Sequence, residues 1–375
     1  MASSGSRTPA DAPGEPELDA LRRRIDAVDA SLLEAMNERA RLVQQIGRLK
    51  RGSGAPVYEP QRERAIVERL LRANPGPFPA TGLAPVFREI ISATRSLEEP
   101  VRVAYLGPEG TFSHLAARRT FGSLTRLEPV PSIADVFGAV ERGRAELGVV
   151  PVENTSEGIV TAAYDAFAEH EVGIGGEILM PVTQHLLSRS GRLDRVRRVA
   201  SHPQPLAQCR GWLDRHLPGV ERIETPSTAA AARLAADDEA VAAIGSAIAG
   251  ESCGLRTVEA AIQDRGDNTT RFVLISREPS SPPSGRDLTS VLFTLRRDEP
   301  GALYRLLEPF ARCQVNLSSI QLRPMKDKPW EYLFFLDAEG HQSEPRMAQA
   351  LAEAARVALS HRVLGSFARS RPEAR

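Results

Sequence analysis

Residues 267–272 read DNTTRF and lead directly into the apolar run VLIS. This stretch places an amide, two hydroxyls and a guanidinium, on Asn268, Thr269, Thr270 and Arg271, at the start of a strand of bulky residues. Asn and Thr side chains often satisfy the backbone of a turn, which is one interpretation of the crowding. The other interpretation is a cleft in which a cation holds an anion and a hydroxyl delivers a proton.

Three further polar motifs each follow a strand-like apolar segment: GPEGTFSH at 107–114, PVENTSEG at 151–158 and SHPQPLAQC at 201–209. Ligands of doubly wound α/β folds bind at the carboxyl ends of strands, so these motifs are candidate binding loops. The first opens a helix, whose backbone N–H groups could bind a carboxylate. Each motif alone is a weak signal, because NTS is typical of a turn and the first motif does not have the GxGxxG spacing of a dinucleotide site.

A second set of charged residues lies on a long helical stretch near the N-terminus. Arg39, Val43, Ile46 and Lys50 follow the spacing i, i+4, i+7, i+11, so Arg39 and Lys50 share a helix face. Arg22 lies 17 residues before Arg39, about 100° around the axis, and could reach the same site only from a partner chain. A solvated, salt-bridged surface is one interpretation, and a cation cage around an anion is the other. Two further helices contribute polar residues at their ends: Glu59, Arg62, Glu63, Thr94 and Glu98.

The composition is that of a globular protein with two or three domains. The chain has 375 residues, 42% hydrophobic and 26% charged, with a formal net charge of zero, so neither a nucleic-acid nor a membrane partner is expected. Cys209, Cys253 and Cys313 are far apart, which disfavours zinc and a disulfide framework, and we expect no metal and no cofactor. No signal peptide or apolar span of ~20 residues occurs, so we expect a cytoplasmic protein with a disordered leader over residues 1–17.

Residues 18–99 have helical periodicity, and we expect an all-α domain there. Its first helix, of about 34 residues, would span ~50 Å. A helix of that length usually packs against a partner chain, so the pattern indicates an intertwined homodimer. Two shorter helices are expected over 60–73 and 82–98.

Two further domains are expected beyond these helices. Short strands alternate with helices over 101–277, which indicates two α/β lobes around a cleft, with a largely parallel sheet. A linker over 278–287 leads to a strand–helix–strand–strand–helix–strand order over 288–367, which is the α+β ferredoxin-like arrangement. Residues 368–375 form a tail.

The helical region resembles the all-helical chorismate mutase family over 18–99. The segments that carry the resemblance are LRRRIDAVDASLLEAMNERARLVQQIGRLK, PQRERAIVERL and FREIISATRSLEE. It implies that Arg22 of the other protomer, Arg39 and Arg62 bind the carboxylates of chorismate, Lys50 the ether oxygen and Glu63 the ring hydroxyl. Such a unimolecular rearrangement needs a fixed reactive conformer and stabilised negative charge, but no nucleophile.

Three positions of this region depart from the residues that some members of the mutase family carry. Glu59, Thr94 and Glu98 stand where those members have Asp, Ser and Gln. A carboxylate cannot donate a hydrogen bond to the ether oxygen, so Glu98 must be protonated, against an ordinary pKa of ~4.3. We expect burial to raise the pKa of Glu98, with mutase activity falling toward alkaline pH.

The four polar motifs, in this order, resemble prephenate dehydratase over 101–277, a fold of two lobes similar to the type II periplasmic binding proteins. The resemblance implies that Thr270 is the general acid that protonates the departing ring hydroxyl, polarised by a backbone N–H or by Asn268. Arg271 is expected near the substrate carboxylates, and Phe272 completes the TRF motif. The remaining residues that the resemblance places around the pocket are Glu153, Asn154, Thr155, Ser201, His202, Gln204 and Gln208.

The C-terminal segments GALYRLLEPFARCQVNLSSIQLRP and PWEYLFFLD resemble the ACT regulatory domain. The family binds phenylalanine at a dimer interface, through GAL and a downstream ESRP that reads QLRP here, so effector identity and affinity stay open. A dimerisation module without a ligand is the alternative. The positions that the resemblance assigns to the effector are Gly301, Ala302, Leu303, Asn316, Gln321, Arg323 and Pro324.

The three regions together, in this order, resemble a bifunctional chorismate mutase–prephenate dehydratase. The resemblance implies conversion of chorismate to prephenate and of prephenate to phenylpyruvate, in phenylalanine biosynthesis, with feedback inhibition by phenylalanine. A homodimer is expected, and a higher oligomer is left open. Two alternatives remain, a ligand-binding regulator without catalysis and a dehydratase whose helical region serves dimerisation alone.

Overall fold

The computed structural model describes residues 15–50, 60–97, 101–279, 281–295, 299–325 and 332–370. Contacts divide the chain into two units, one of residues 1–57 and 93–99 and one of residues 58–92 and 100–375. Among the residues that the structure describes, no helix is long and apolar enough to cross a bilayer.

The first unit consists of one long helix and the end of another. Helix α1 (Glu15–Lys50) has 36 residues, and α3 (Ala80–Arg95) ends in the same unit. The periodicity that predicts a single long helix is therefore confirmed. Its apolar residues lie largely in the open, because Ile25, Val28 and Leu32 are 59%, 58% and 52% exposed. An apolar stripe of this length on one helix is typical of a surface that another chain covers.

The second unit begins with α2 (Pro60–Ala73), where a helix is predicted, and with most of α3. Helix α3 starts two residues before the predicted 82–98 and ends three residues earlier. Glu89 on α3 accepts hydrogen bonds from the backbone N–H and the hydroxyl of Ser123 at 3.1 and 2.6 Å. These bonds attach α3 to the segment that follows α4 (Phe112–Phe121).

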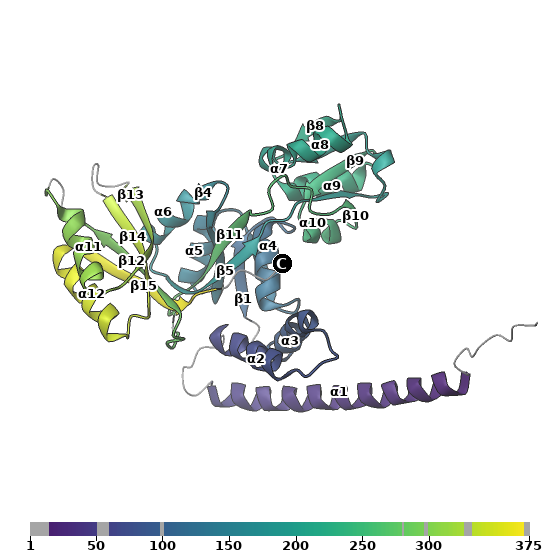
Figure 1. Ribbon diagram of the computed structural model, residues 1–375, viewed down its shortest axis with the longest axis horizontal. Coiled ribbons are helices and arrows are strands. Elements are labelled where there is room, and N and C mark those ends of the chain that lie inside the picture. The colour runs from purple at the N-terminus through teal and green to yellow at the C-terminus, as the bar shows by residue number, and fades with distance from the viewer. Residues whose placement is uncertain are drawn as a thin grey trace, which may run out of the picture. The chain divides into compact units, whose positions relative to one another are not determined.

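The first α/β lobe, called lobe A, contains a mixed sheet in the order β2-β1-β3-β11-β5, with β4 paired to β3. Figure 1 labels β1, β4, β5 and β11 of this lobe. Its strands are β1 (Arg102–Leu106), β2 (Arg126–Val130), β3 (Leu147–Asn154), β4 (Gly158–Ile159), β5 (Gly173–Pro181) and β11 (Thr269–Ser276). Strand β1 is parallel to β2 and β3, whereas β11 is antiparallel to β3 and β5. The expectation of a largely parallel sheet is corrected here, because β11 returns from the second lobe and enters the sheet in the reverse direction.

The helices of lobe A are α4, α5 (Ile133–Glu141) and α6 (Thr161–Glu169). Thr111 and Ser132 cap α4 and α5 by accepting from the backbone N–H groups of His114 and Asp135. Such a cap satisfies one of the donors that a helix leaves unpaired at its first turn. Hydroxyl side chains thus open α4 and α5, whereas α6 begins after Val160 without a side-chain cap.

The second lobe, called lobe B, has a sheet in the order β10-β6-β9-β7-β8. Strand β7 is parallel to β8 and β9, and β6 is antiparallel to β9 and β10. Apolar clusters pack on both faces of this sheet. The elements of lobe B are β6 (His185–Ser188), η1 (Leu193–Arg195), β7 (Arg198–Ser201), α7 (Pro203–Gln208), α8 (Arg210–His216), β8 (Glu221–Glu224), α9 (Thr228–Asp237), β9 (Val241–Gly245), α10 (Ala247–Ser252) and β10 (Arg256–Glu259).

The C-terminal sheet, called the regulatory sheet, is antiparallel with the order β13-β14-β12-β15. Two helices cover one of its faces, with a core that includes Phe293, Leu306, Phe310 and Met347. The predicted ferredoxin-like order of elements is confirmed. These elements are β12 (Asp287–Thr294), α11 (Ala302–Arg312), β13 (Leu317–Pro324), β14 (Tyr332–Glu339), α12 (Pro345–Val357) and β15 (Ser360–Ala368).

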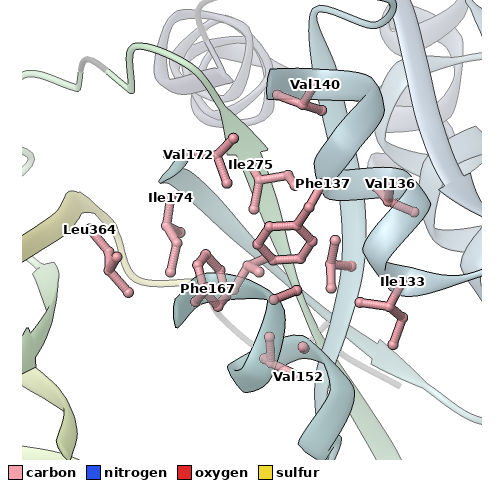
Figure 2. Packing of buried hydrophobic residues seen from close by; sticks show 14 of the residues in the cluster. Ile133, Val136, Phe137, Val140, Val152, Phe167, Val172, Ile174, Ile275 and Leu364 are labelled. Atoms are coloured by element: carbon pink, nitrogen blue, oxygen red, sulfur yellow. The ribbon is translucent and has the colours of Figure 1, made fainter. Parts of the chain in front are cut away.

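The other face of the regulatory sheet shares one apolar core with lobe A. Figure 2 shows Leu364 of β15 beside this core, in which the rings of Phe137 and Phe167 meet edge to face with centroids 4.8 Å apart. Tyr164 and Phe335 form a second such pair, at 5.0 Å, across the junction. The regulatory sheet is thus packed onto lobe A by buried side chains from both.

Two glycines bring the backbones of β5 and β15 together at this junction. A Cβ atom on Gly365 would lie 2.1 Å from the carbonyl oxygen of Ile174, and one on Gly173 would lie 2.3 Å from the carbonyl oxygen of Leu364. Contacts this short are not tolerated, so both positions require the absence of a side chain. Gly365 also has a φ of 153°, which disfavours other residues.

Candidate functional site

The reversed direction of β11 explains why DNTTRF precedes a strand whereas the other motifs follow one. Because β11 is antiparallel to β3, its first residues lie at the carboxyl end of β3, and Thr270 pairs with Asn154 in the sheet register. Both side chains are 8% exposed. Asn154 Nδ2 donates a hydrogen bond of 2.8 Å to Thr270 Oγ1. Two of the predicted site residues are thus brought together, 116 positions apart in the chain.

The backbone fixes which end of the Asn154 amide faces the threonine. Asn154 Oδ1 accepts from the backbone N–H of Ser156 at 2.9 Å, so the oxygen is turned toward the loop and the nitrogen toward Thr270. A hydroxyl that accepts from an amide can still donate its own proton, and the donated N–H stabilises negative charge on its oxygen. This arrangement makes the Thr270 hydroxyl a better acid than an isolated threonine.

Thr155, the next predicted residue, joins the two motifs through hydrogen bonds. Its backbone N–H donates to the carbonyl of Thr269 at 3.0 Å, and its hydroxyl accepts from the Thr269 N–H at 3.0 Å. The same hydroxyl donates to the carbonyl of Asp267 at 3.2 Å. The hydroxyl of Thr155 therefore holds DNTTRF against PVENTSEG.

The loop GPEGTFSH uses two of its backbone donors internally. The N–H of Gly110 donates to His114 Nδ1 at 3.1 Å, and the N–H of His114 donates to Thr111 Oγ1 at 3.2 Å. His114 stacks on Tyr105 with centroids 5.1 Å apart, and burial lowers the pKa of His114, in keeping with a neutral ring that accepts at Nδ1. The expectation that this helix start binds a carboxylate is therefore not supported at these two donors.

The predicted residues of lobe B lie around the end of β7 and the start of α7. The Ser201 hydroxyl is fully buried and donates to the carbonyl of Ile244 at 2.7 Å, which is a structural bond. His202 caps α7, and its Nδ1 accepts from the N–H of Gln204 at 3.4 Å. Gln208 Oε1 accepts from Gln184 Nε2 at 3.2 Å. His202, Gln204 and Gln208 are all partly exposed.

Cys209 is fully buried in the core of lobe B. Burial raises the pKa of its thiol to about 12, so the thiolate is not formed at neutral pH. Cys209 is therefore a packing residue of the lobe B core.

Two passages of chain connect the lobes, and they are hydrogen-bonded to each other. The N–H of Val182 donates to the carbonyl of Asn268 at 2.9 Å, and the N–H of Ile262 donates to the carbonyl of Gln184 at 2.9 Å. The Asn268 side chain is buried, and within the described part of the chain its Oδ1 has no hydrogen-bond partner. The side-chain hydrogen bond to the Thr270 hydroxyl comes instead from Asn154.

Contacts between the lobes are found at the motif loops. The Ser246 hydroxyl at the start of α10 donates to the carbonyl of Gly110 at 3.0 Å, and this bond is buried. Partial desolvation raises the pKa of Glu157, and the charge of His202 acts in the opposite direction. PVENTSEG in lobe A and SHPQ in lobe B thus lie within electrostatic reach of each other.

Arg271 does not lie with Thr270. Successive residues of a strand point to opposite faces, and the guanidinium of Arg271 lies on the face that meets the regulatory sheet. There its Nε donates to Glu177 Oε2 at 2.9 Å and its Nη1 donates to Asp337 Oδ2 at 2.6 Å. Glu153 pairs with Arg271 in the register, and Phe272 is 1% exposed within the core. The structure therefore gives no support to a contact between Arg271 and substrate carboxylates.

One pair of predicted mutase residues is in contact within the first unit. Arg39 Nη1 of α1 donates to Thr94 Oγ1 of α3. Arg22 bonds to Asp19 at 3.3 Å and its side chain is 65% exposed. The side chain of Lys50 and the whole of Glu59 and Glu98 lie outside the described residues.

The remaining predicted mutase residues, Arg62 and Glu63, belong to α2 in the second unit. Arg62 is exposed and Glu63 is partly buried. Glu63 borders a cavity of about 720 Å³ whose lining also includes Arg88, Arg119 and Arg369. Thr270 is not among the residues that line this cavity.

The predicted effector residues lie around α11 and on β13. Gly301 caps α11 with a left-handed φ of 78°. Ala302 is buried, whereas Leu303 is 42% exposed. Arg323 is held by lobe A, since its Nε and Nη2 donate to Asp165 Oδ1 at 3.0 and 2.7 Å. Of the other predicted residues, Gln321 is partly buried, whereas Asn316 and Pro324 are exposed.

Three protein families match successive parts of the chain. Chorismate mutase type II matches residues 21–99, prephenate dehydratase matches residues 103–280 and the ACT domain matches residues 289–356. Solved structures with similar folds include the prephenate dehydratase of Arthrobacter aurescens in complex with L-Phe, with a TM-score of 0.66 and 38% identity over 72% of this chain and 90% of that one. Another, GqqA, described as a novel type of quorum quenching acylase, has a TM-score of 0.66 and 31% identity over 72% of this chain and 98% of that one.

A whole-length relative carries all three parts. The bifunctional chorismate mutase/prephenate dehydratase of Aquifex aeolicus is 46% identical over 355 residues, which cover 94% of this chain and 98% of that protein. The order of the three family matches and the extent of this similarity agree with the two α/β lobes, the ferredoxin-like sheet and the helical N-terminal region. The chain therefore belongs to the bifunctional chorismate mutase/prephenate dehydratase family of enzymes, with a C-terminal ACT domain.

Proposed function

We propose that the protein converts chorismate to prephenate in its helical region and prephenate to phenylpyruvate between lobes A and B, in phenylalanine biosynthesis. The observation that carries the second activity is the hydrogen bond from Asn154 to Thr270. Aromatisation drives the loss of CO₂ and of the ring hydroxyl from prephenate, but hydroxide leaves poorly unless it is protonated. Thr270 supplies that proton, water and CO₂ depart, and solvent returns the proton to Thr270, so the net reaction takes up one proton.

The geometry supports different roles for different residues of the predicted pocket. Thr270 is the acid, and the Asn154 N–H stabilises the alkoxide that forms on it. His202, Gln204 and Gln208 are partly exposed at the facing loop of lobe B, and we assign them to substrate binding. The remaining predicted residues, Glu153, Thr155, Ser201 and Phe272, position the loops and strands.

Replacing the acid tests the dehydratase assignment. Thr270→Val keeps the shape of the side chain and removes the hydroxyl, so kcat for phenylpyruvate formation should fall by about 10²- to 10⁴-fold. Thr270→Ser keeps the hydroxyl and should retain much of the activity. The rate of prephenate formation from chorismate is the control for folding. Loss of both activities in Thr270→Val, or a fully active Thr270→Val, would contradict separate sites with this acid.

For the mutase we propose a site that two protomers complete. Arg39 and Thr94, which touch in one protomer, would be joined by Arg22 of the second, and the exposed apolar face of α1 supports a homodimer. The residues assigned on the strength of the resemblance are Lys50, Glu59, Arg62, Glu63 and Glu98. Incubation of the purified protein with chorismate should yield prephenate and then phenylpyruvate.

We also propose that phenylalanine inhibits the dehydratase through the ACT domain. The support is the match to that domain, the left-handed Gly301 at the start of α11 and the L-Phe complex of the Arthrobacter aurescens relative. Addition of phenylalanine should lower the rate of phenylpyruvate formation. An unchanged rate at millimolar phenylalanine would refute the inhibition.

Two coarser features complete the proposal. We infer domain limits at 18–99, 101–277 and 288–367, with a linker over 278–287. The described cysteines, Cys209, Cys253 and Cys313, are all free, which favours a reducing compartment such as the cytoplasm.

A further inference from the structure

The guanidinium of Arg271 connects the strand that carries Thr270 with the regulatory sheet. It is 14% exposed and lies between two carboxylates, Glu177 on β5 of lobe A and Asp337 on β14 of the regulatory sheet. These carboxylates are 3% and 13% exposed. Burial alone would lower the pKa of Arg271, but the charges of Asp337 and Glu177 outweigh it and raise the pKa.

Each carboxylate is held on its far side as well. Asp337 Oδ1 accepts from the hydroxyl of Ser290 on β12. Glu177 Oε1 accepts from the N–H of Ser370 at 2.7 Å, and the Glu177 carbonyl accepts from the Ser370 hydroxyl at 2.6 Å. The cavity beside this cluster measures about 20 Å³, which leaves little room for rearrangement. The guanidinium is therefore fixed by two partners that are themselves fixed.

The position of Arg271 determines the position of the proton donor. Arg271 and Thr270 are consecutive, so a shift of Asp337 that moves the Arg271 backbone through the ion pair also moves Thr270. The pairing of β11 with β3 is irregular between Arg271 and Phe272. Thr270 and Arg271 therefore form the end of the β11–β3 ladder beyond this irregularity, whereas on the other side they pair regularly with Met180 and Leu179 of β5.

Asp337, the member of this cluster on the regulatory sheet, lies on the strand next to β13, which carries predicted effector residues. Ser319 of β13 pairs with Asp337 of β14, and Arg323 of β13 pairs with Leu333. Arg323 also bonds to Asp165 of lobe A. Displacement of β13 or β14 on ligand binding would therefore change the position of Asp337 relative to lobe A.

We propose that Arg271 is a positioning residue that couples the regulatory sheet to catalysis. Through Asp337 it holds Thr270 in register with Asn154, and a movement of β14 releases or shifts the proton donor without any contact between effector and substrate. The proposal rests on the proposed dehydratase function. It replaces the substrate-binding role expected for Arg271.

A buried interdomain ion pair could instead serve stability alone, and removing one partner of such a pair is usually destabilising. The two roles differ in what they change. A stabilising pair affects the amount of folded enzyme, whereas a positioning pair changes kcat and the effector response of the folded enzyme.

Asp337→Asn is the central variant, because it removes the charge and retains an oxygen for Ser290. We expect kcat for prephenate to fall by about 5- to 150-fold, the usual range of a coupling between sites, with KM within about twofold because the substrate contacts persist. Binding of phenylalanine, measured by calorimetry on the full-length protein, should persist while its inhibition of the dehydratase weakens. Arg271→Lys should likewise lower kcat and weaken the inhibition by phenylalanine, because an ammonium cannot donate to both carboxylates in the fixed geometry of a guanidinium.

The matched control is Arg362→Lys. Arg362 of β15 also crosses the junction, with its Nη1 donating to the carbonyl of His170 at 2.9 Å and its Nη2 to that of Phe167, so these bonds reach the end of α6 rather than β11. Its kcat and phenylalanine response should equal those of the wild type, even if its Tm falls. The mutase rate reports the amount of folded protein for all three variants.

Two results would overturn the proposal. One is an Asp337→Asn enzyme with wild-type kcat and wild-type inhibition, and the other is an Arg362→Lys enzyme with the same kcat loss as Asp337→Asn. Failure of Arg271→Lys to fold would leave Asp337→Asn as the deciding variant. A wild-type protein without dehydratase activity would refute the proposed function instead, which is a distinguishable outcome.

Discussion

Replacement of Asn154 by aspartate tests the direction of the hydrogen bond on which the proposed acid depends. In the wild type the amide nitrogen donates to Thr270 and the amide oxygen accepts from the N–H of Ser156. In Asn154→Asp the second oxygen can still accept from Ser156, but the oxygen that faces Thr270 cannot donate. The threonine would then turn its own proton toward the new carboxylate and away from the substrate.

The expected loss follows from the strength of one hydrogen bond to a charged oxygen. Such a bond contributes about 1.5–3 kcal/mol, and about 1.36 kcal/mol corresponds to a tenfold change in rate. The kcat of the dehydratase should therefore fall by about 10- to 150-fold. KM should change less, because the bond stabilises charge that develops only as the proton leaves.

The same variant should acquire a pH dependence of a defined sign. Both side chains of the pair are 8% exposed, so burial will raise the pKa of the new carboxyl above that of a free aspartic acid. Below that pKa the carboxyl is protonated and can donate to Thr270 again. The loss of dehydratase kcat relative to the wild type should therefore be smaller in acid and larger as the pH rises.

The assay is phenylpyruvate formation from prephenate, with kcat and KM determined across a pH series for wild type and Asn154→Asp. Ser156→Ala is the matched control, because the bond to Asn154 uses the backbone N–H of Ser156 and survives the change. The mutase rate again reports folding. A wild-type kcat in Asn154→Asp, or a loss that is confined to KM and constant with pH, would refute the assigned direction of the bond.

Val28→Glu places a charge on the exposed apolar face of α1, so it should shift the sedimentation coefficient toward the monomer and abolish mutase activity; a dimeric, active variant would contradict the α1 interface. The hydrogen bond from His170 lowers the pKa of Glu141, so its stabilisation exists above the ordinary pKa of glutamate and is lost as the pH falls through the lowered value. Glu141→Gln should accordingly have a lower Tm than the wild type at neutral pH and an equal Tm in strong acid, and equal Tm values throughout would disprove this. Burial raises the pKa of Cys209 to about 12, so iodoacetamide should label this thiol in unfolded protein and spare it in native protein, as peptide mapping would establish.

The order and type of the elements were predictable, because hydrophobic periodicity and helix caps are local properties of the chain. The helix over 60–73 matches α2, and the C-terminal strands and helices occur in the predicted order. The direction of β11 was not predictable in this way. It depends on where the chain returns from lobe B, and nothing in the letters TTRFVLIS encodes the neighbour of a strand.

The proposed proton donor, Thr270, was singled out by its motif, but its surroundings were not predictable from the sequence. The amide next to Thr270 belongs to Asn154, and sequence proximity favoured Asn268 instead. Arg271 illustrates the same limit. A guanidinium next to a candidate catalytic hydroxyl in the sequence suggests anion binding, but consecutive side chains of a strand point to opposite faces, and Arg271 contacts Glu177 and Asp337 instead. Alternation could have signalled this, because consecutive residues of a strand cannot both face one cleft.

The glycines at positions 173 and 365 limit which other domain could replace the ACT domain in this protein. Main chain touches main chain there, so a transplanted module would need a side-chain-free residue at the matching point of its last strand. A truncated dehydratase that ends before residue 287 would leave Phe167 and Ile174 without their cover and would be prone to aggregate. A chimera with an altered response to an effector should therefore carry its changes in the ACT domain away from Gly365 and leave the attachment of β15 to β5 intact.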